Sequence, residues 1–365
     1  MKNSNNIKDF LIFGHNYIGD VLMLTPAIRA LKLKFPESRI TVAVSKNASF
    51  VLRRNPDICK IVETEKLNGI KGIAGIFKLF ATLNGIKKKN GHKFYACINF
   101  LTSFKFSLLG FLLAKKQIGQ KKILNNFFLH ERIIFDKNLN NTDKSLKFIE
   151  PFYINSGEKY FDRNCVYNVD DSDIKNAENI LKNSFDGYGI NIDAENFKFV
   201  LLSPGSTRRS KEAAPELFSL FADYLNKKGF YTVITGSGND RQTSKKIYDK
   251  IGNKHLNADL TGLTDIYTLG GLIKKSFLVV SVDNGTMHLS SAIKTPVIAL
   301  FGSTDPSVCG PAGDNIYIID KKTDCYHCFY KKCLKDGFNI NGYSDCMGRI
   351  TPEDLITGFE YLSKK

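Results

Sequence analysis

The chain has 365 residues, of which 43% are hydrophobic and 24% charged, a composition typical of a globular protein with a substantial core. At about 100 to 200 residues per domain, this length indicates two domains. The first residues lack the apolar stretch of a secretory signal, and no uncharged apolar run approaches the length of about 18 residues that spans a bilayer. We therefore expect a cytoplasmic protein without a membrane-spanning helix.

The net charge of +16 is concentrated in one half of the chain. Residues 1–160 contain 27 Lys and Arg against 11 Asp and Glu, whereas residues 161–365 contain 25 of each kind. A basic half attracts anionic partners such as nucleic acid, a phosphorylated glycolipid or the acidic face of a membrane. A basic, solvated surface without a specific partner is the alternative. Nucleic acid is disfavoured because no RRM, KH or OB pattern is present.

In the first half, short apolar runs alternate with longer amphipathic stretches. The runs predict strands at 7–13, 39–44, 58–63 and 94–99, with helices near 20–34, 70–88 and 103–114. The segment nearest to a membrane helix is "FLTSFKFSLLGFLLAKK" at 100–116, which Lys105 interrupts. We interpret it as a core helix, with contact to a membrane surface as the less favoured alternative.

The second half repeats this alternation. Strands are predicted at 198–203, 230–235, 277–282 and 296–301, with helices near 215–228, 240–251, 264–274 and 285–293. Strand and helix in turn predict parallel sheets with helices on both faces. We expect two α/β lobes joined by the polar segment 156–196. Their ligand is expected in the cleft between the lobes, at the carboxyl ends of the strands.

Three glycine-containing turns follow predicted strands of the second half: "SPGSTRRSK" at 203–211, "TGSGNDR" at 235–241 and "SVDNGTMH" at 281–288. Glycine beside small polar residues lets backbone N–H groups approach an anion, and a following helix N-terminus favours negative charge. None of the turns has the spacing of a P-loop or of a dinucleotide-binding fingerprint. Taken singly, each is also explained by turn geometry. Together they predict a phosphate-bearing ligand.

Several side chains in these turns suit such a ligand. Arg208, Arg209 and Lys211 can pair with a diphosphate. Asp240 follows the second strand, where an acidic residue can bind ribose hydroxyls, and Asp283 precedes the third helix. For both aspartates, helix capping is an alternative explanation. His288 either points toward the same ligand or packs as an ordinary histidine.

Near the start of the chain, a lone carboxylate lies where a buried strand gives way to an apolar helix. The stretch is "GHNYIGDVLMLTPAIRALKLKF" at 14–35, and the carboxylate is Asp20. A helix N-terminus favours the ionised form of a carboxylate by about 0.3 to 1 kcal/mol. An ionised Asp20 could serve as a base. The alternative is that Asp20 only complements the helix dipole. Pro26 either kinks this helix or starts its main segment.

Four cysteines are clustered near the end of the chain with two, four and twelve residues between them: Cys325, Cys328, Cys333 and Cys346. This spacing fits tetrahedral ligation of zinc or iron by thiolates, as a structural staple outside the chemistry. Free thiols are the alternative in a reducing cytoplasm, where disulfides are disfavoured.

Three stretches resemble the motifs of glycosyltransferase family 9, the ADP-heptose:lipopolysaccharide heptosyltransferases and their relatives. They are "IGDVLMLTPAIRALKLKFP", "SPGSTRRSK" followed by "PELF", and "SVDNGTMHLSSAIKTPVIALFGSTDP". The resemblance implies a GT-B fold, with two Rossmann-like domains of mostly parallel sheets facing a central cleft. The implied domains are an acceptor-binding domain at 1–165, a donor-binding domain at 166–350 with the cysteine-rich segment 325–346, and a C-terminal helix at 351–365.

The resemblance also implies roles for individual residues. The family's proposed general base falls on Asp20, with His15 and Gly19 beside it to receive the acceptor. The family's Asp-x-Gly-x-x-His pattern, which holds the donor diphosphate, falls on 283–288. The family's Lys-x-Trp-Pro is replaced by "KEAAPELF", in a chain without tryptophan, which leaves Arg208, Arg209 and Lys211 as alternatives at the phosphate. Of these, we expect Lys211. The full set of expected donor-binding residues is Ser206, Thr207, Arg209, Lys211, Gly236, Asp240, Asp283, Asn284, Gly285, Thr286 and His288.

By this resemblance, the protein is expected to be an inverting glycosyltransferase that needs no metal or other cofactor for catalysis. It would move heptose from ADP-heptose to a lipopolysaccharide core or a related surface glycan. Its acceptor would be an anionic glycolipid at the inner face of the cytoplasmic membrane. One alternative is a protein O-heptosyltransferase of the autotransporter-modifying type, in which a comparable cysteine cluster holds iron. Another is a nucleotide-sugar-binding protein without catalysis.

Overall fold

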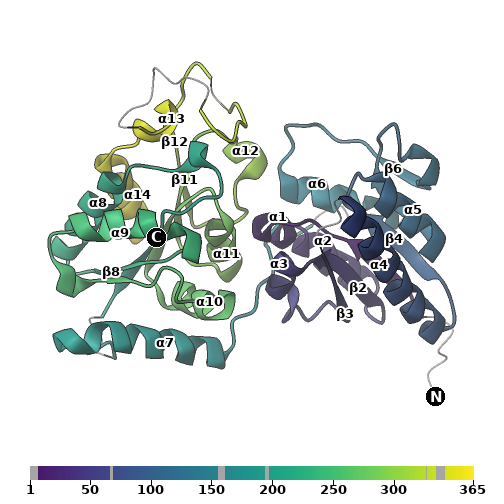
Figure 1. Cartoon of the computed structure of the whole chain (residues 1–365), viewed down its shortest axis with the longest axis horizontal. Coiled ribbons are helices and arrows are strands. Elements are labelled where there is room, and N and C mark those ends of the chain that lie inside the picture. The colour runs from purple at the N-terminus through teal and green to yellow at the C-terminus, as the bar shows by residue number, and fades with distance from the viewer. Residues whose placement is uncertain (1–6, 66–68, 155–160, 194–196, 326, 334–341) are drawn as a thin grey trace. The chain divides into compact units, whose positions relative to one another are not determined.

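The computed structural model describes residues 7–65, 69–154, 161–193, 197–325, 327–333 and 342–365. The chain divides into two compact units, Met1–Tyr167 (unit 1) and Asn168–Lys365 (unit 2). Each unit contains one six-stranded sheet whose strands all run parallel, with helices packed against it (Figure 1). The predicted fold class, two α/β domains with parallel sheets, is confirmed.

Unit 1 alternates strands and helices along the chain. Its sheet has the order β3-β2-β1-β4-β5-β6. Its strands are β1 (Asp9–Phe13), β2 (Arg39–Ser45), β3 (Lys60–Thr64), β4 (Phe94–Asn99), β5 (Ala114–Gln120) and β6 (Glu131–Ile133). Its helices are α1 (Ile18–Leu22), α2 (Thr25–Lys34), α3 (Lys46–Ser49), α4 (Gly69–Asn90), α5 (Phe104–Leu113) and α6 (Asn141–Lys147), with 3-10 turns η2 (Phe50–Leu52), η3 (Asn126–Phe128) and η4 (Glu150–Phe152).

Unit 2 is built in the same way, with the sheet order β12-β11-β10-β7-β8-β9. Its strands are β7 (Phe199–Ser203), β8 (Tyr231–Ile234), β9 (Asn257–Asp259), β10 (Leu278–Val282), β11 (Val297–Phe301) and β12 (Ile316–Asp320). Its helices are α7 (Asp171–Phe185), α8 (Pro215–Lys227), α9 (Arg241–Lys250), α10 (Ile266–Lys275), α11 (Gly285–Ile293), α12 (Pro306–Cys309), α13 (Asp345–Gly348) and α14 (Pro352–Ser363), with 3-10 turns η5 (Asp186–Tyr188), η6 (Arg209–Lys211), η7 (Gly238–Asp240) and η8 (Lys254–Leu256).

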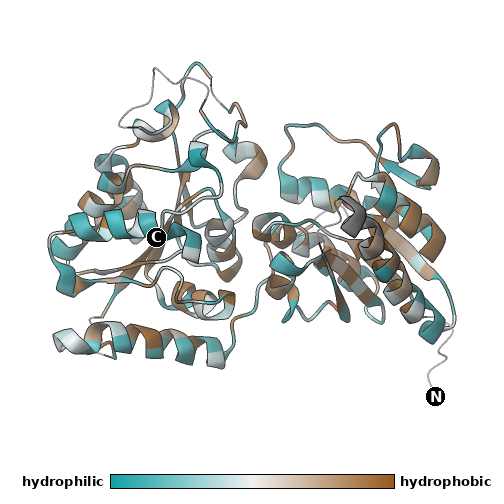
Figure 2. Cartoon of the chain, in the orientation of Figure 1, coloured by the Kyte–Doolittle hydropathy of each residue, from teal (hydrophilic) through white to brown (hydrophobic). Residues whose placement is uncertain are grey.

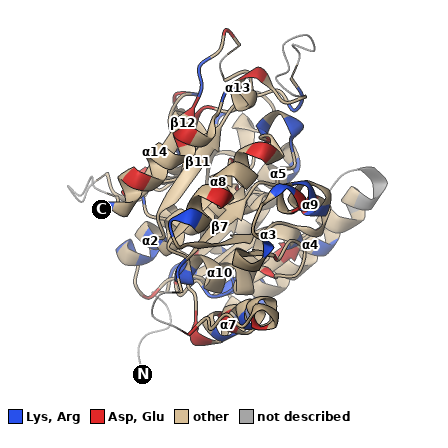
Figure 3. Ribbon diagram, turned by 90° about the vertical axis from the view of Figure 1, so that its left-hand side faces the viewer, with Lys and Arg blue, Asp and Glu red and all other residues tan. Residues whose placement is uncertain are grey.

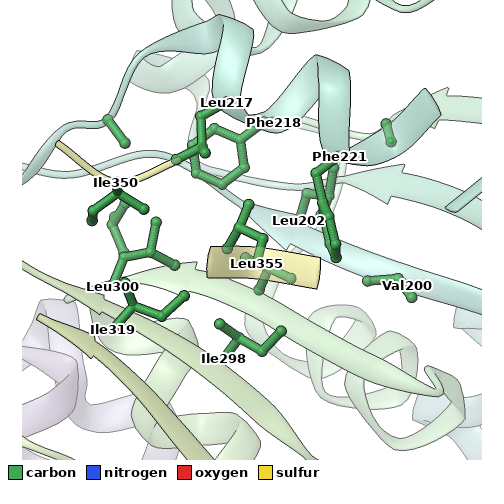
Figure 4. Close-up of a cluster of buried hydrophobic side chains, with 14 of the residues drawn as sticks. Val200, Leu202, Leu217, Phe218, Phe221, Ile298, Leu300, Ile319, Ile350 and Leu355 are labelled. Atoms are coloured by element: carbon green, nitrogen blue, oxygen red, sulfur yellow. The ribbon is translucent and has the colours of Figure 1, made fainter. Parts of the chain in front are cut away.

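The central strands form because their apolar runs are buried on both faces of the sheet. All five residues of β1, β7, β10 and β11 are buried, as expected for parallel strands covered by helices on both sides. In unit 2, α8 and α14 pack on one face, where Phe218 and Leu355 meet strand residues such as Leu300 (Figure 4).

The two sheets have the same connectivity. With the strands of each unit numbered from its own first strand, both sheets read 3-2-1-4-5-6. In unit 1, the neighbouring strands β1 and β4 are therefore followed by connections on opposite sides of the sheet. The same holds for β7 and β10 in unit 2. In open α/β sheets, ligands bind outside the carboxyl ends of the strands at such a switch point.

The structure corrects several details of the sequence prediction. The helix predicted at 20–34 is two helices, and Pro26 is the second residue of α2, so it starts the main segment. The polar segment 156–196 is more than a linker because it contains α7, whose start is fixed by a capping box between Asp170 and Asp173. The segment 100–116 is not a core helix throughout, since its last residues enter β5 and parts of α5 are exposed. Four strands were not predicted: β5, β6, β9 and β12.

Among the helices of the described residues, none combines the length and the apolar character needed to cross a bilayer.

Candidate functional site

The three predicted phosphate-binding turns leave neighbouring strands of unit 2. The strands β10, β7 and β8 lie side by side and run parallel, so their carboxyl ends meet at one edge of the sheet. Asn284, at the start of α11, donates through its side-chain amide to the backbone oxygen of Gly205 at 2.8 Å and to Ser203 Oγ at 3.1 Å. Ser203 Oγ donates in turn to Thr286 Oγ1 at 3.0 Å. The turns after β7 and β10 are therefore bonded together, while their shared binding of a phosphate-bearing ligand stays a prediction.

Asn284 also caps α11. Its side-chain oxygen accepts from the backbone N–H groups of Thr286 and Met287 and from Ser281 Oγ. The helix cap is thus Asn284, and the capping alternative considered for Asp283 does not apply. Both the oxygen and the nitrogen of the Asn284 side-chain amide therefore form hydrogen bonds within the protein. These bonds fix the orientation of the start of α11 at the carboxyl edge of the sheet.

Asp283 is the centre of a buried charge pair. Lys211 Nζ donates to Asp283 Oδ2 at 2.6 Å, with the two side chains 13% and 7% exposed. Thr304 Oγ1 donates to the same carboxylate oxygen. Because Lys211 belongs to η6 after β7 and Thr304 follows β11, three turns of the sheet contribute to this cluster. Lys211 is therefore held in place at the carboxyl edge of the sheet.

Asp240 belongs to the turn after β8, and its side chain lies next to Gly205 in the turn after β7. Its Oδ2 accepts from the backbone N–H and the hydroxyl of Ser237, both at 2.7 Å, which forms a capping box. A Cβ atom at Gly205 would lie 2.3 Å from Asp240 Cγ, and one at Gly236 would lie 3.0 Å from its Cβ. A side chain at position 205 would therefore clash with the carboxylate, whereas one at position 236 would make a tight contact. The capping interpretation is observed, while a contact of Asp240 with ribose stays a prediction.

The remaining predicted donor residues lie on the same turns. Thr207 and Arg209 are exposed, and Ser206 is half-buried with its Oγ accepting from the N–H of Arg208 at 3.2 Å. Gly285 and His288 belong to the first residues of α11, where His288 is 5% exposed.

Sequence reasoning missed two polar residues of this site. Thr304 could have been found, because "FGSTDP" repeats the pattern of glycine and hydroxyl residues after a strand. Glu212 follows η6, and burial raises the pKa of its carboxyl while the charge of Arg209 opposes that shift. A carboxyl with a raised pKa beside a predicted ligand site is a candidate for ligand contact.

In unit 1, the predicted acceptor residues lie between β1 and α2. Asp20 is the third residue of α1 and is half-buried, as is Gly19. Burial lowers the pKa of His15, and the charge of Asp20 opposes this effect. His15 is therefore neutral at pH 7, and it lies close enough to Asp20 for their charges to interact.

The expected zinc or iron site is not supported. Across the described residues, no group of three or more His, Cys, Asp or Glu side chains is arranged to hold a metal ion. The four cysteines do line one small pocket, together with Ser210 and Ser303. Burial raises the pKa of Cys346 to about 11, and the charges of the other three cysteines act in the same direction. Cys325, Cys328, Cys333 and Cys346 are all free cysteines.

Two parallel α/β units with the connectivity described above, one of them carrying hydroxyl-, glycine- and lysine-containing turns suited to a diphosphate, are the architecture of a GT-B glycosyltransferase. The comparison with protein families specifies the class further. The sequence model of glycosyltransferase family 9 (heptosyltransferase) matches residues 87–338. The chain belongs to this family, and it is a glycosyltransferase.

Known relatives agree with this assignment. The chain is 27% identical over 311 residues to lipopolysaccharide heptosyltransferase 3 of Escherichia coli K12. This alignment covers 82% of this chain and 84% of the relative. Among solved structures, the family 9 glycosyltransferase of Veillonella parvula superposes with a TM-score of 0.82, at 20% identity and 97% coverage of both chains. The E. coli ADP-heptose lipopolysaccharide heptosyltransferase II superposes with a TM-score of 0.76 at 18% identity, over 97% of this chain and 98% of that one. These superpositions show the fold.

Proposed function

We propose that this protein transfers heptose from ADP-heptose to the core of a lipopolysaccharide or lipooligosaccharide, with inversion at the anomeric carbon. The observation that carries the proposal is membership of glycosyltransferase family 9, over a match of residues 87–338. A relative of matching length is named a lipopolysaccharide heptosyltransferase. The alternatives, a protein acceptor and a binder without catalysis, are not favoured by this relative.

Unit 2 binds the donor in this proposal. Departure of ADP leaves additional negative charge on its terminal phosphate, which a preorganised cation stabilises. Lys211 supplies this cation, with Arg209 exposed on the same turn. A carboxylate repels a diphosphate, so the contribution of Asp283 is to hold the Lys211 ammonium in position together with Thr304.

Unit 1 supplies the base. A sugar hydroxyl that attacks an anomeric carbon loses its proton as the new bond forms, and a carboxylate within hydrogen-bond reach can take it. Asp20 fills this role, because it is half-buried rather than enclosed and follows Gly19, which adds no side chain to the acceptor side. Burial lowers the pKa of His15, so the imidazole next to Asp20 is neutral at pH 7 and carries one N–H rather than two.

The proposed reaction needs no metal or other cofactor. The acceptor lipid places the reaction at the cytoplasmic face of the inner membrane, so the protein acts there as a peripheral enzyme. The excess of basic residues in unit 1 supports an anionic acceptor, since such a field raises the local concentration of anionic glycolipid.

The test is a transfer assay with purified protein, ADP-heptose and a lipopolysaccharide core that lacks the terminal heptose. A product heavier by one heptose is expected, with ADP released in equal amount. ADP-, GDP- and UDP-hexoses serve as donor controls, and a thermal shift reports binding. A true donor at about 100 times its dissociation constant stabilises the protein by about 2.7 kcal/mol. Absence of transfer from ADP-heptose, despite binding of another nucleotide sugar, would contradict the proposed donor.

A further inference from the structure

Unit 1 carries an exposed apolar surface whose side chains are not buried in its core. It is formed by α5 and the turn that follows β5, and we call it the α5 patch. Its members are between 38% and 97% exposed: Phe104, Phe111, Leu112, Ile123, Leu124 and Phe127. Figure 2 shows the hydrophobic residues along α5 in brown. Exposed apolar side chains that occur singly are normal, but a group of six on adjoining elements indicates a contact surface.

The patch is continuous because the ring of Phe128 contacts both the exposed residues of α5 and those of the turn after β5. Phe128 of η3 lies with its ring centroid 5.2 Å from that of Phe104 and 5.7 Å from that of Phe111. It also contacts Phe127, at 5.6 Å. The exposed residues of α5 and those of the turn therefore belong to one surface.

The turn is held in a defined conformation that directs its apolar residues outward. Asn125, only 1% exposed, accepts from the N–H of Lys122 at 2.9 Å and donates to the backbone oxygen of Gln120 at 3.1 Å. These bonds place a polar side chain inside and leave Ile123 and Leu124, at 97% and 76% exposure, outside. This is the reverse of the arrangement that burial of apolar area favours in water.

The charged side chains nearest the patch in the sequence are mostly basic, and the acidic neighbour Glu131 pairs with Lys116 at 2.9 Å. Residues 104–130 contain five lysines and no aspartate or glutamate. Lys105 on α5 is exposed, and Lys121 and Lys122 lie directly before the apolar tip of the turn and are exposed as well. In a symmetric contact between two copies, the same patch would face itself and bring these lysines together. An anionic surface complements them.

We propose that the α5 patch docks unit 1 on an anionic phospholipid bilayer. This inference rests on the proposed function in that an enzyme with a lipid-linked acceptor needs access to the membrane surface. The apolar side chains enter the boundary between headgroups and acyl chains, while the lysines contact lipid phosphates, as in other interfacial segments with this pattern. Unit 2, with 24 basic and 24 acidic residues, has no corresponding charge excess.

The test measures co-sedimentation of the full-length protein with vesicles. Vesicles of phosphatidylcholine alone are compared with vesicles that contain about 30% phosphatidylglycerol, an anionic fraction that gives a negative surface potential. The wild type is expected to bind the anionic vesicles. Replacing Ile123→Ser and Leu124→Ser together is expected to lower the partition coefficient by about tenfold or more. Lys121→Gln with Lys122→Gln is expected to weaken binding to the anionic vesicles only.

The matched control carries two exposed leucines of unit 2, Leu220→Ser and Leu263→Ser, which are 55% and 59% exposed. It is expected to bind vesicles like the wild type. Unchanged vesicle binding by the variant at Ile123 and Leu124 would overturn the proposal. It would also be overturned if light scattering showed an oligomer that this variant dissociates, with no vesicle binding by the wild type, because the patch would then join copies of the chain.

A second assay separates this inference from the proposed function. Heptose transfer to a lipid-free core oligosaccharide is measured with the wild type and with the variant at Ile123 and Leu124, and equal rates are expected. Loss of transfer by the wild type in this assay, with vesicle binding intact, would contradict the proposed function and leave the docking surface standing. A variant that transfers to the lipid-free acceptor more slowly than the wild type would place the patch in acceptor binding and overturn its assignment to membrane docking alone.

Discussion

The two units have the same strand order but place their most buried ion pairs at opposite ends of the sheet. In unit 2 the pair belongs to a network at the carboxyl ends, where Lys211, Asp283 and Asn284 tie neighbouring turns together. In unit 1 the most buried ion pair of the described residues belongs to a network at the amino ends. There Asp9, 2% exposed at the start of β1, accepts two bonds from Arg39 at the start of β2, at 2.6 and 2.7 Å.

Asn90 and His92, just before β4, complete the unit 1 network. Asn90 donates to Asp9 Oδ2 at 2.8 Å, and His92 Nε2 lies 3.1 Å from the same oxygen. Ligands of open α/β sheets bind at the carboxyl ends, so a network at the amino ends joins strands without meeting a ligand. We infer that the shared topology separates the two tasks: the unit 2 network serves binding and the unit 1 network serves stability.

The two units also differ in net charge. Unit 1 contains 28 basic and 12 acidic residues, whereas unit 2 contains 24 of each. Figure 3 shows basic and acidic residues side by side on α8 and α9 of unit 2. In the proposed function, unit 2 therefore binds its anionic donor through a few placed groups, while unit 1 attracts its anionic acceptor through its overall field.

The largest expected effect follows replacement of the proposed base. Asp20→Asn keeps the shape of the side chain but removes its capacity to accept a proton, so turnover should fall by about 10²- to 10⁴-fold. Donor affinity, which unit 2 provides, should change little. Steady-state kinetics and donor titration measure both quantities. Asp136→Asn, an exposed carboxylate of unit 1, is the control. Turnover within twofold of the wild type would remove Asp20 from the chemistry.

The next effect concerns the buried charge pair of unit 2. Lys211→Met removes the cation opposite the departing phosphate and should lower kcat/KM by about 10²-fold, with weaker ADP binding. Lys245→Met, in an exposed pair with Asp249, is the control.

A double variant tests whether Asp283 acts through Lys211. If it does, adding Asp283→Asn to Lys211→Met should cause little further loss, since the carboxylate no longer has an ammonium to hold. The asparagine also removes the charge that Lys211→Met leaves buried and unpaired, so the double variant should be the more stable of the two. A further large loss of ADP affinity would show that Asp283 contacts the donor by another route.

Several features were predictable because they depend on short stretches of chain. The strands β1, β7, β10 and β11 are continuous apolar runs, and a strand buried on both faces leaves this signal in the sequence. The strand β5 was missed because its sequence, "AKKQIGQ", contains adjacent lysines and continues directly from α5. The strands β6 and β9 have only three residues each, too few for a periodic pattern.

The candidate site likewise combines local features, which the sequence predicts, with contacts between distant segments, which it does not. Its turns were predicted, because each is local, but the bond from Thr304 to Asp283 joins turns of two neighbouring strands. Only the sheet order brings these residues together. The spacing of the four cysteines likewise placed them around one pocket but did not determine the directions of their side chains, on which metal ligation depends.

A smaller effect, on stability alone, should follow disruption of the unit 1 network. Arg39→Met leaves the Asp9 carboxylate with Asn90 and His92 as partners. Since the arginine side chain is 40% exposed, the loss should be modest, about 1 to 2 kcal/mol. Thermal unfolding should report a midpoint a few degrees lower, with kcat unchanged at low temperature. Arg163→Met, in a more exposed pair with Asp143, should lower the midpoint less. An activity loss without a stability loss would contradict the division of tasks between the two networks.

The smallest effect is a pH dependence of stability in unit 1. Burial lowers the pKa of His15 in the folded protein, so below a pH of about 6.5 the unfolded chain takes up this proton first. The contribution of His15 to stability is therefore complete above about pH 6.5 and is lost as the pH falls toward the folded pKa. His15→Gln should reduce the drop in unfolding midpoint between pH 7.5 and 5.5, whereas His255→Gln, at an exposed site of unit 2, should not. Equal drops for the wild type and the His15 variant would show that this histidine titrates alike in the folded and unfolded chains. Asp20 would then lie beside an imidazolium below pH 6.5, and its proposed role as a base would be confined to higher pH.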